Sequence, residues 1–182
     1  MEYALQIFVL LILLVLSFGC MVYAISITWS LLRGAPYVSS SMHEVRAILR
    51  EVALQKDMRF LELGCGDGRV TCEAVATYGV IGRGVDISPL WVFGARIRAR
   101  FMGISNRAEF QVADILKTDL ASFDVIYLYM MPRFIARHAE TLFARCRPGT
   151  LIISHVFDIP ALQAQAIEAH QPRYYLYKIS TP

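Results

Sequence analysis

The sequence predicts an open, doubly wound α/β fold with a mostly parallel sheet, preceded by one N-terminal transmembrane helix. From residue 58 onward, short and almost continuously apolar runs alternate with segments of helical spacing. This is the pattern of strands buried on both faces and of the helices that cover them. The first run leads into a turn with glycine at alternate positions, Gly64, Gly66 and Gly68. Ahead of it, residues 3–32 contain no charged side chain.

Residues 3–32 consist almost entirely of Leu, Ile, Val, Phe and Ala. A hydrocarbon layer about 30 Å thick requires roughly 20 helical residues, so this run is long enough to span it. Tyr23 and Trp29 lie toward its C-terminal end, where aromatic side chains gather at a membrane interface. A cleaved signal peptide is one alternative, but Glu2 makes the start acidic and the apolar run is long for that role. A buried core helix is another, but 182 residues leave too little protein to cover it.

The charges beside the span predict its orientation. Arg33, Arg46 and Arg50 follow it, whereas the only basic group that precedes it is the α-amine. The positive-inside tendency therefore places the C-terminal part in the cytoplasm, with the span in the inner membrane if the source is bacterial. We divide the chain into a transmembrane anchor at residues 1–33, a linker with an amphipathic helix at residues 34–57, and an α/β domain at residues 58–182.

The remaining elements follow in order. Residues 34–40 form a linker, and Ser41 with Glu44 has the spacing of a capping box at the start of the amphipathic helix. Pro89 suits the first turn of a later helix. Strands are expected at residues 60–63, 80–85, 108–112, 123–129, 150–157 and 174–179, and helices at residues 70–78, 89–102, 133–145 and 160–170.

Composition excludes some classes of function. The net charge of +3 is too small for the dense basic surface of a nucleic-acid-binding domain. The four cysteines show no paired or metal-ligand spacing, so we expect free thiols in a reducing compartment and no zinc or other metal site.

Polar residues at the carboxyl ends of the expected strands are the candidates for ligand binding, because open α/β sheets bind ligands there. Glu62, Asp86 and Asp114 end the first three strands. Asp86 lies about 20 residues beyond the glycine turn, the position of a carboxylate that binds ribose hydroxyls. It could instead cap the helix that begins at Pro89. Asp114 could bind the exocyclic amine of adenine, or it could be only a turn residue.

The glycine spacing separates two classes of cofactor. A dinucleotide fingerprint has its third glycine three residues after the second, where this chain has Arg69. Glu62 before the turn and Asp67 within it place negative charge where a pyrophosphate would be repelled and an ammonium group tolerated. We therefore expect S-adenosylmethionine rather than NAD.

The stretch Glu62-x-Gly64-x-Gly66-x-Gly68 resembles motif I of the class I S-adenosylmethionine-dependent methyltransferases, and the resemblance continues through residues 84–86 and 112–114. It implies a Rossmann-like methyltransferase domain at residues 58–182. It further implies that Glu62, Gly64 and Gly66 hold the methionine part of the cofactor, that Asp86 holds the ribose and that Asp114 holds the adenine, with Gly68 completing the turn.

Residues 36–38, 64–69 and 84–91 are similar to the membrane-anchored lysine methyltransferases. This family includes the mitochondrial enzymes that act on the ATP synthase c-subunit and on the adenine nucleotide translocase, and bacterial relatives. Cys65 is commonly serine in that family and Asp86 commonly glutamate, and residues 127–132 match its strand-four loop only loosely. The resemblance implies a protein lysine as acceptor, in a substrate associated with the membrane.

Methyl transfer needs little more from a protein than positioning and desolvation of the nucleophile, since the cofactor supplies the reactivity. The candidate substrate-binding residues gather at the end of the fourth expected strand: Tyr127, Tyr129, Met130 and Pro132. Aromatic side chains can hold a methylated ammonium by cation–π contact. Tyr127 and Met130 could instead be packing residues. Tyr129 and His155 are the candidate catalytic residues, and His155 could move a proton or be purely structural.

We therefore expect a membrane-anchored methyltransferase that acts on a protein lysine. A small lipophilic acceptor such as a quinone or lipid fits the anchor equally well. An oxidoreductase is disfavoured by the glycine spacing. A non-catalytic cofactor-binding membrane scaffold is a further alternative. The arginines of residues 89–102, at positions 96, 98 and 100, are interpreted as a solvated helix face.

Overall fold

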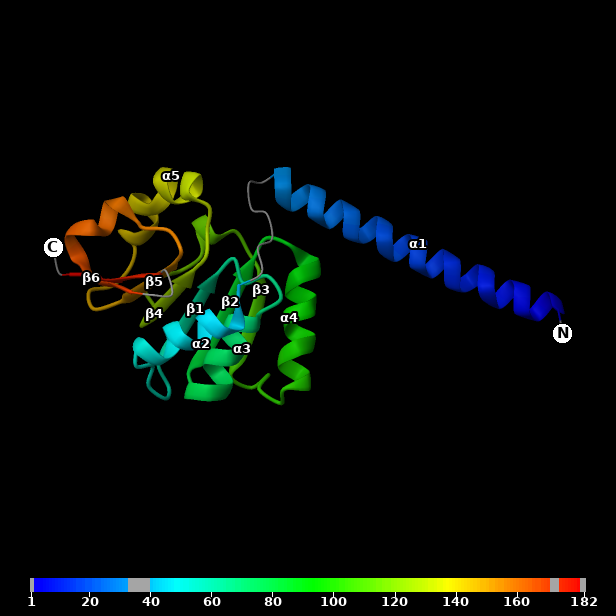
Figure 1. The fold of residues 1–182 in the computed structure, drawn as a ribbon, viewed down its shortest axis with the longest axis horizontal. Helices are drawn as coiled ribbons and strands as arrows, with labels where there is room; N and C mark the ends of the chain where they lie inside the picture. The colour runs from blue at the N-terminus through cyan, green and yellow to red at the C-terminus, as the bar shows by residue number, and fades with distance from the viewer. Residues whose placement is uncertain (1, 33–39, 171–173, 181–182) are drawn as a thin grey trace. The chain divides into compact units, whose positions relative to one another are not determined.

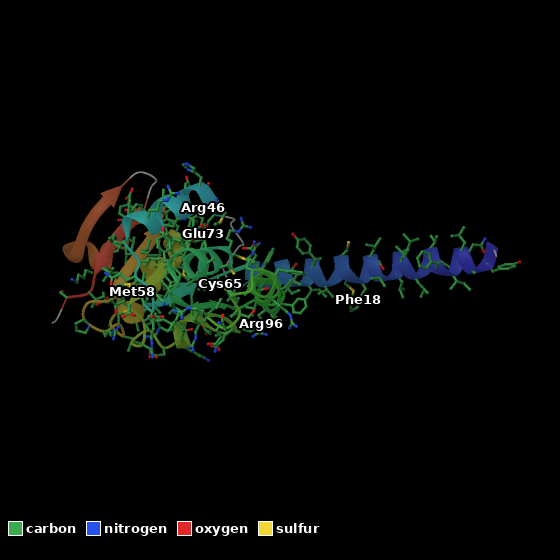
Figure 2. All side chains as sticks on the ribbon, turned by 90° about the horizontal axis from the view of Figure 1, so that it is seen from below. Phe18, Arg46, Met58, Cys65, Glu73 and Arg96 are labelled. Atoms are coloured by element: carbon green, nitrogen blue, oxygen red, sulfur yellow. The ribbon has the colours of Figure 1, made fainter. Side chains whose placement is uncertain are left out.

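The computed structural model describes residues 2–32, 40–170 and 174–180. The chain divides into two compact units, Met1–Tyr37 and Val38–Pro182. The first contains one helix, α1 (Glu2–Leu32), whose part Tyr3–Ile25 is long and apolar enough to cross a membrane and has no buried residue. Phe18 projects freely from this helix (Figure 2). The polar side chains Ser17 and Thr28 donate to the backbone carbonyls of Leu14 and Ala24, so their hydroxyls are satisfied within the helix.

The second unit is built on a seven-stranded sheet, counted over the described residues, with the order β3-β2-β1-β4-β5-β7-β6. The strands are β1 (Arg59–Leu63), β2 (Ile81–Asp86), β3 (Ala108–Val112), β4 (Val125–Leu128), β5 (Leu151–His155), β6 (Ala166–His170) and β7 (Tyr174–Lys178). The first five pair in parallel, and β7 runs antiparallel to both β5 and β6. The strand order reverses between β1 and β4. This confirms the predicted doubly wound, mostly parallel sheet.

Helices cover both faces of the sheet (Figure 1). On one face, α2 (Met42–Glu51), α3 (Arg69–Tyr78) and α4 (Pro89–Phe101) pack on the strand residues Phe60, Val125 and Ile153. On the other, α5 (Pro132–Phe143) and the 3₁₀ helix η2 (Pro160–Gln165) pack on Leu61, Ile126 and Ile152. A second 3₁₀ helix, η1 (Ile115–Lys117), follows β3. Neighbouring strand residues thus enter opposite cores, as the period of two requires.

Helix α2 belongs to the core of the second unit. Its residues Val45, Ile48 and Leu49 are completely buried, and Arg46 forms an ion pair of 2.9 Å with Glu73 of α3 (Figure 2). The predicted linker at residues 34–40 lies, except for Ser40, outside the described residues. The structured domain therefore includes the amphipathic helix that precedes β1.

Two predictions of local structure are wrong. Residues 160–170 are not one helix: the 3₁₀ helix η2 ends at Gln165, and Ala166–His170 form strand β6. Pairing with β7 overrides the helical spacing of this segment. The capping box also does not form, because the Ser41 side chain makes no capping hydrogen bond.

Candidate active site

The glycine turn is held against β2 by its own backbone. The amides of Gly64 and Cys65 both donate to the carbonyl of Val85, at 2.9 and 3.0 Å, and the amide of Gly68 donates to the carbonyl of Cys65 at 2.8 Å. Gly64, Gly66 and Gly68 all have positive φ, at 73°, 50° and 72°. This left-handed backbone explains the glycine at alternate positions.

One side of the turn is packed and the other is open. A Cβ on Gly68 would lie 2.6 Å from the Phe110 ring and 2.7 Å from Ala95, so the backbone itself packs against β3 and α4. A Cβ on Gly64 would meet only the Met130 methyl, at 3.6 Å, and Gly64 is exposed. The open side therefore lies at the carboxyl ends of β1 and β4, beside the switch point where such sheets bind ligands. An adenosyl cofactor fits a turn with this open side.

Asp86 joins the glycine turn to the start of α4. One carboxylate oxygen accepts the amide of Gly66 at 2.9 Å, and the other accepts the amide of Ser88 at 2.8 Å. Burial raises the pKa of Asp86, and the hydrogen bonds from the backbone amides oppose this effect. The N-cap of α4 is Ser88, so Asp86 closes the preceding turn rather than capping the helix. Its position at the end of β2 is the one that the ribose prediction requires, and the contact itself stays a prediction.

Glu62 lies beneath the turn, 5% exposed. Its Oε2 accepts both the amide and the hydroxyl of Thr71, at 2.9 and 2.6 Å. Burial raises the pKa of Glu62 to about 8, so the side chain is mostly protonated at neutral pH. In the structure Glu62 secures the start of α3 to β1, and its predicted contact with the methionine part of the cofactor stays a prediction.

The negative charge of Asp67 is compensated by two arginines. Its Oδ2 lies 2.8 Å from Arg69 and 2.7 Å from Arg98. Burial acts to raise the pKa of Asp67, but these two guanidinium groups outweigh it and lower the pKa. The sequence argument that Glu62 and Asp67 together repel a pyrophosphate is therefore not supported, since the first is mostly neutral and the second is paired.

All three α4 arginines are exposed, as predicted, but two of them also bind neighbouring parts of the domain. Arg98 also donates to the backbone carbonyl of Asp67 at 3.0 Å, and Arg96 donates twice to the carbonyl of Phe110, at 2.9 and 2.7 Å. They fasten α4 to the glycine turn and to β3. Sequence reasoning missed this role because each partner is distant in the chain.

Asp114 follows β3 and closes the first turn of η1, where its Oδ1 accepts the amide of Leu116 at 2.9 Å. The turn role is thus present, and the predicted contact with adenine stays a prediction. Pro132 is the exposed first residue of α5, a position that suits proline. Met130 is half-buried beside the open side of the glycine turn.

Tyr127 and His155 form a buried pair at the ends of β4 and β5. The Tyr127 hydroxyl lies 2.8 Å from His155 Nδ1, and the two residues are 1% and 2% exposed. His155 Nε2 lies 3.5 Å from a carboxylate oxygen of Glu44 on α2, without a hydrogen bond. Burial lowers the pKa of His155, and Glu44 partly opposes this effect. This enclosure fits the structural alternative for His155, and its predicted catalytic role stays a prediction.

The Tyr129 ring packs on His155 of that pair. Its ring centroid lies 4.7 Å from His155 and 6.3 Å from Phe157, and the side chain is half-buried. Of the two tyrosines, only Tyr129 retains exposed surface with which to contact an acceptor. The packing interpretation therefore fits Tyr127, and the predicted aromatic wall fits Tyr129 with Phe157.

The sequence of residues 62–166 matches the family model of the ANTKMT methyltransferase domain, which is more than half of the chain. The chain belongs to the ANTKMT methyltransferase family. It is an S-adenosylmethionine-dependent methyltransferase, as structural neighbours crystallised with S-adenosylhomocysteine also indicate.

Three proteins show what this ANTKMT-family chain is similar to. A protein-lysine N-methyltransferase of Saccharolobus islandicus is 26% identical over 125 residues, 68% of this chain and 78% of that protein. The ATP synthase c-subunit lysine N-methyltransferase of Mus musculus is 24% identical over 69% of this chain and 50% of its own length. An RNA methyltransferase of Salinibacter ruber, solved with S-adenosylhomocysteine, is 27% identical, with a TM-score of 0.75 over 80% of this chain and 95% of that chain. The match thus spans about half the length of the mouse protein.

In this ANTKMT-family methyltransferase, S-adenosylmethionine supplies an activated methyl group on a sulfonium when it is bound. The chain's own residues shape the surroundings. Gly64 is exposed on the open side of the turn, the Asp86 carboxylate lies at the end of β2, and the Tyr129 ring packs on His155. Their contacts with the cofactor and the acceptor stay predictions.

Replacing Glu62 by glutamine should flatten the pH dependence of stability. The pKa of Glu62 is raised from its ordinary value of 4.5 to about 8, so the folded protein holds a proton that the unfolded chain releases across this range. Stability therefore falls as pH rises from about 5 to 8, by on the order of 4 kcal/mol if burial acts in full. Glu62→Gln retains an oxygen acceptor for Thr71 and should lose far less. Urea midpoints of the full chain in detergent, at about pH 5 and pH 8, measure the difference.

Glu140→Gln on the exposed side of α5 is the matched control, and it should keep the wild-type pH dependence. If Glu62→Gln and the wild type lose the same stability over this range, Glu62 is not a proton-holding group.

Proposed function

We propose that this methyltransferase is held at a membrane by α1, with its domain on the cytoplasmic side, and that it methylates lysine side chains of a membrane-associated protein. The observation that carries the proposal is the match to relatives named as lysine N-methyltransferases, one of them over 78% of its length. The apolar stretch Tyr3–Ile25 supports the membrane part. The orientation is supported by the arginines that follow this stretch in the sequence, Arg33, Arg46 and Arg50.

The chemistry of the candidate acceptor site agrees with an amine substrate. A methylated lysine carries a positive charge surrounded by methyl groups, and such a cation is attracted to an aromatic face. Tyr129 is half-buried and stacked beside Phe157 at the end of β4. His155 is enclosed behind it with a lowered pKa, so it adds no positive charge that would repel the amine at neutral pH.

Methyl transfer from labelled S-adenosylmethionine in membranes tests the acceptor class. The membranes come from cells that express the full chain, and after reaction they are separated into protein, lipid and nucleic-acid fractions. We expect label in membrane protein. Label only in lipid or quinone would favour the small lipophilic acceptor instead, and label in RNA would overturn the amine assignment. Cofactor binding without transfer to any fraction would favour the non-catalytic scaffold.

A further inference from the structure

Helix α4 carries a second apolar face that the domain does not use. Phe93, Ile97 and Phe101 are 61%, 39% and 88% exposed. Their spacing of four residues places them along one line of the helix. Gly94 lies beside this line, where an added Cβ would have no atom within 4 Å. We call these four residues the outer face of α4.

The apolar residues of the outer face are not needed to pack α4 on the sheet. The opposite side of α4 supplies the completely buried residues Val92, Ala95 and Ala99, which satisfy the contact with the sheet. Helix α4 lies next to β3, the edge strand of the described sheet, and no described helix of this unit covers its outer side (Figure 1). Two exposed phenylalanines one turn either side of an exposed isoleucine are costly in water.

The charge on α4 is of one sign. The helix has three arginines and no acidic residue. Arg98 and Arg96 are held by Asp67 and by the Phe110 carbonyl, while Arg100 is exposed and has no ion pair among the described residues. Apolar side chains beside arginines form the pattern of helices that lie in a membrane interface, where arginines meet anionic headgroups.

Only a short stretch of sequence separates the proposed anchor from the domain. Seven residues, 33–39, separate the end of α1 from Ser40, so even fully extended they reach only about 30 Å. Arg69 at the start of α3 donates to the Ser40 carbonyl at 3.4 Å, so the chain enters the domain at the carboxyl edge of the sheet, the edge at which α4 begins. A 13-residue helix is about 20 Å long, so these lengths permit α1 and the outer face to meet the same bilayer.

We propose that the outer face of α4 docks on the surface of the bilayer that holds α1, with Phe93, Ile97 and Phe101 entering the interface and Arg100 binding anionic headgroups. This surface goes beyond the proposed acceptor chemistry, and it rests on the proposed membrane attachment.

Spin labels on the full chain in lipid nanodiscs test the proposal. The label is placed by Gly94→Cys, which leaves every large apolar residue of the face intact, in a chain with Cys20 and Cys146 replaced by alanine; Cys65 and Cys72 are buried. We expect the label at position 94 to collide with oxygen more than with a water-soluble nickel chelate. A label at Thr141→Cys, exposed on α5 across the sheet, should report water. In discs with anionic lipid, Arg100→Glu changes the charge by two units and should shift docking toward the free form on the order of 30-fold. Phe93→Ser with Phe101→Ser should move the label into water.

A separate label on native Cys20, within the apolar part of α1, reports on the anchor itself. If Cys20 is immersed while position 94 is as accessible to nickel as position 141, docking is wrong and the anchor stands. If Cys20 is also in water, both proposals fail. Protection of position 94 only in discs that hold two copies would mean that a second chain covers the face, which also overturns lipid docking.

Discussion

Asp86→Ala should weaken binding of S-adenosylhomocysteine by about 10- to 100-fold or more. The substitution removes the carboxylate at the end of β2, where we expect the ribose hydroxyls, and each hydrogen bond to a charged group contributes about 1.5–3 kcal/mol. It also removes the acceptor of the Gly66 and Ser88 amides, so the glycine turn loses one of its links to the start of α4. Calorimetry on the full chain in detergent measures the affinity.

Asp119→Ala is the matched control for this experiment. Asp119 also closes a local turn, accepting the amide of Ala121 at 3.0 Å, but it lies on an exposed loop outside the candidate site. It should keep the wild-type affinity. An unchanged affinity in Asp86→Ala would leave Asp86 as a brace of the turn only and would remove it from the cofactor site.

Gly68→Ala should destabilise the domain by about 2–5 kcal/mol, a large part of the stability of an ordinary domain. The added methyl would lie 2.6 Å from Phe110 and 2.7 Å from Ala95, and overpacking of this kind costs about 1–3 kcal/mol. The φ of +72° adds roughly 1–2 kcal/mol, because a side chain is strained there. Urea denaturation of the full chain in detergent measures the loss.

Gly103→Ala separates the two causes. Its φ of +68° is nearly the same, but a Cβ there has no neighbour within 4 Å. It should cost only the backbone strain, about 1–2 kcal/mol. Equal losses in the two variants would show that the contact of the glycine turn with β3 and α4 is not tight.

The fold was predictable from the sequence as far as β5, because apolar runs and helical spacing are local signals. The segment at residues 160–170 was not, since β6 exists by pairing with β7 and its own residues favour a helix. Pairing with a neighbouring strand overrides such local preferences, and the sequence of the segment itself does not indicate this pairing.

The candidate site likewise combines features that could be predicted from the sequence with features that could not. The glycine turn and the acids Asp86 and Asp114 were predictable, because their place at strand ends follows from their place in the sequence. The pairing of Arg98 with Asp67, and the enclosure of His155 by Tyr127 and Glu44, join residues far apart in the chain. These contacts compensate the charge of Asp67 and enclose His155, whose predicted catalytic role stays a prediction.

The most direct test of the central claim is to identify the methylated amino acid. Membranes containing the full chain are supplied with S-adenosylmethionine that carries a heavy methyl group, and the protein fraction is hydrolysed and analysed by mass spectrometry. We predict heavy Nε-methyllysine with the wild-type chain, and a strong reduction with Asp86→Ala. Heavy label in another methylated amino acid, with none in methyllysine, would contradict the proposal.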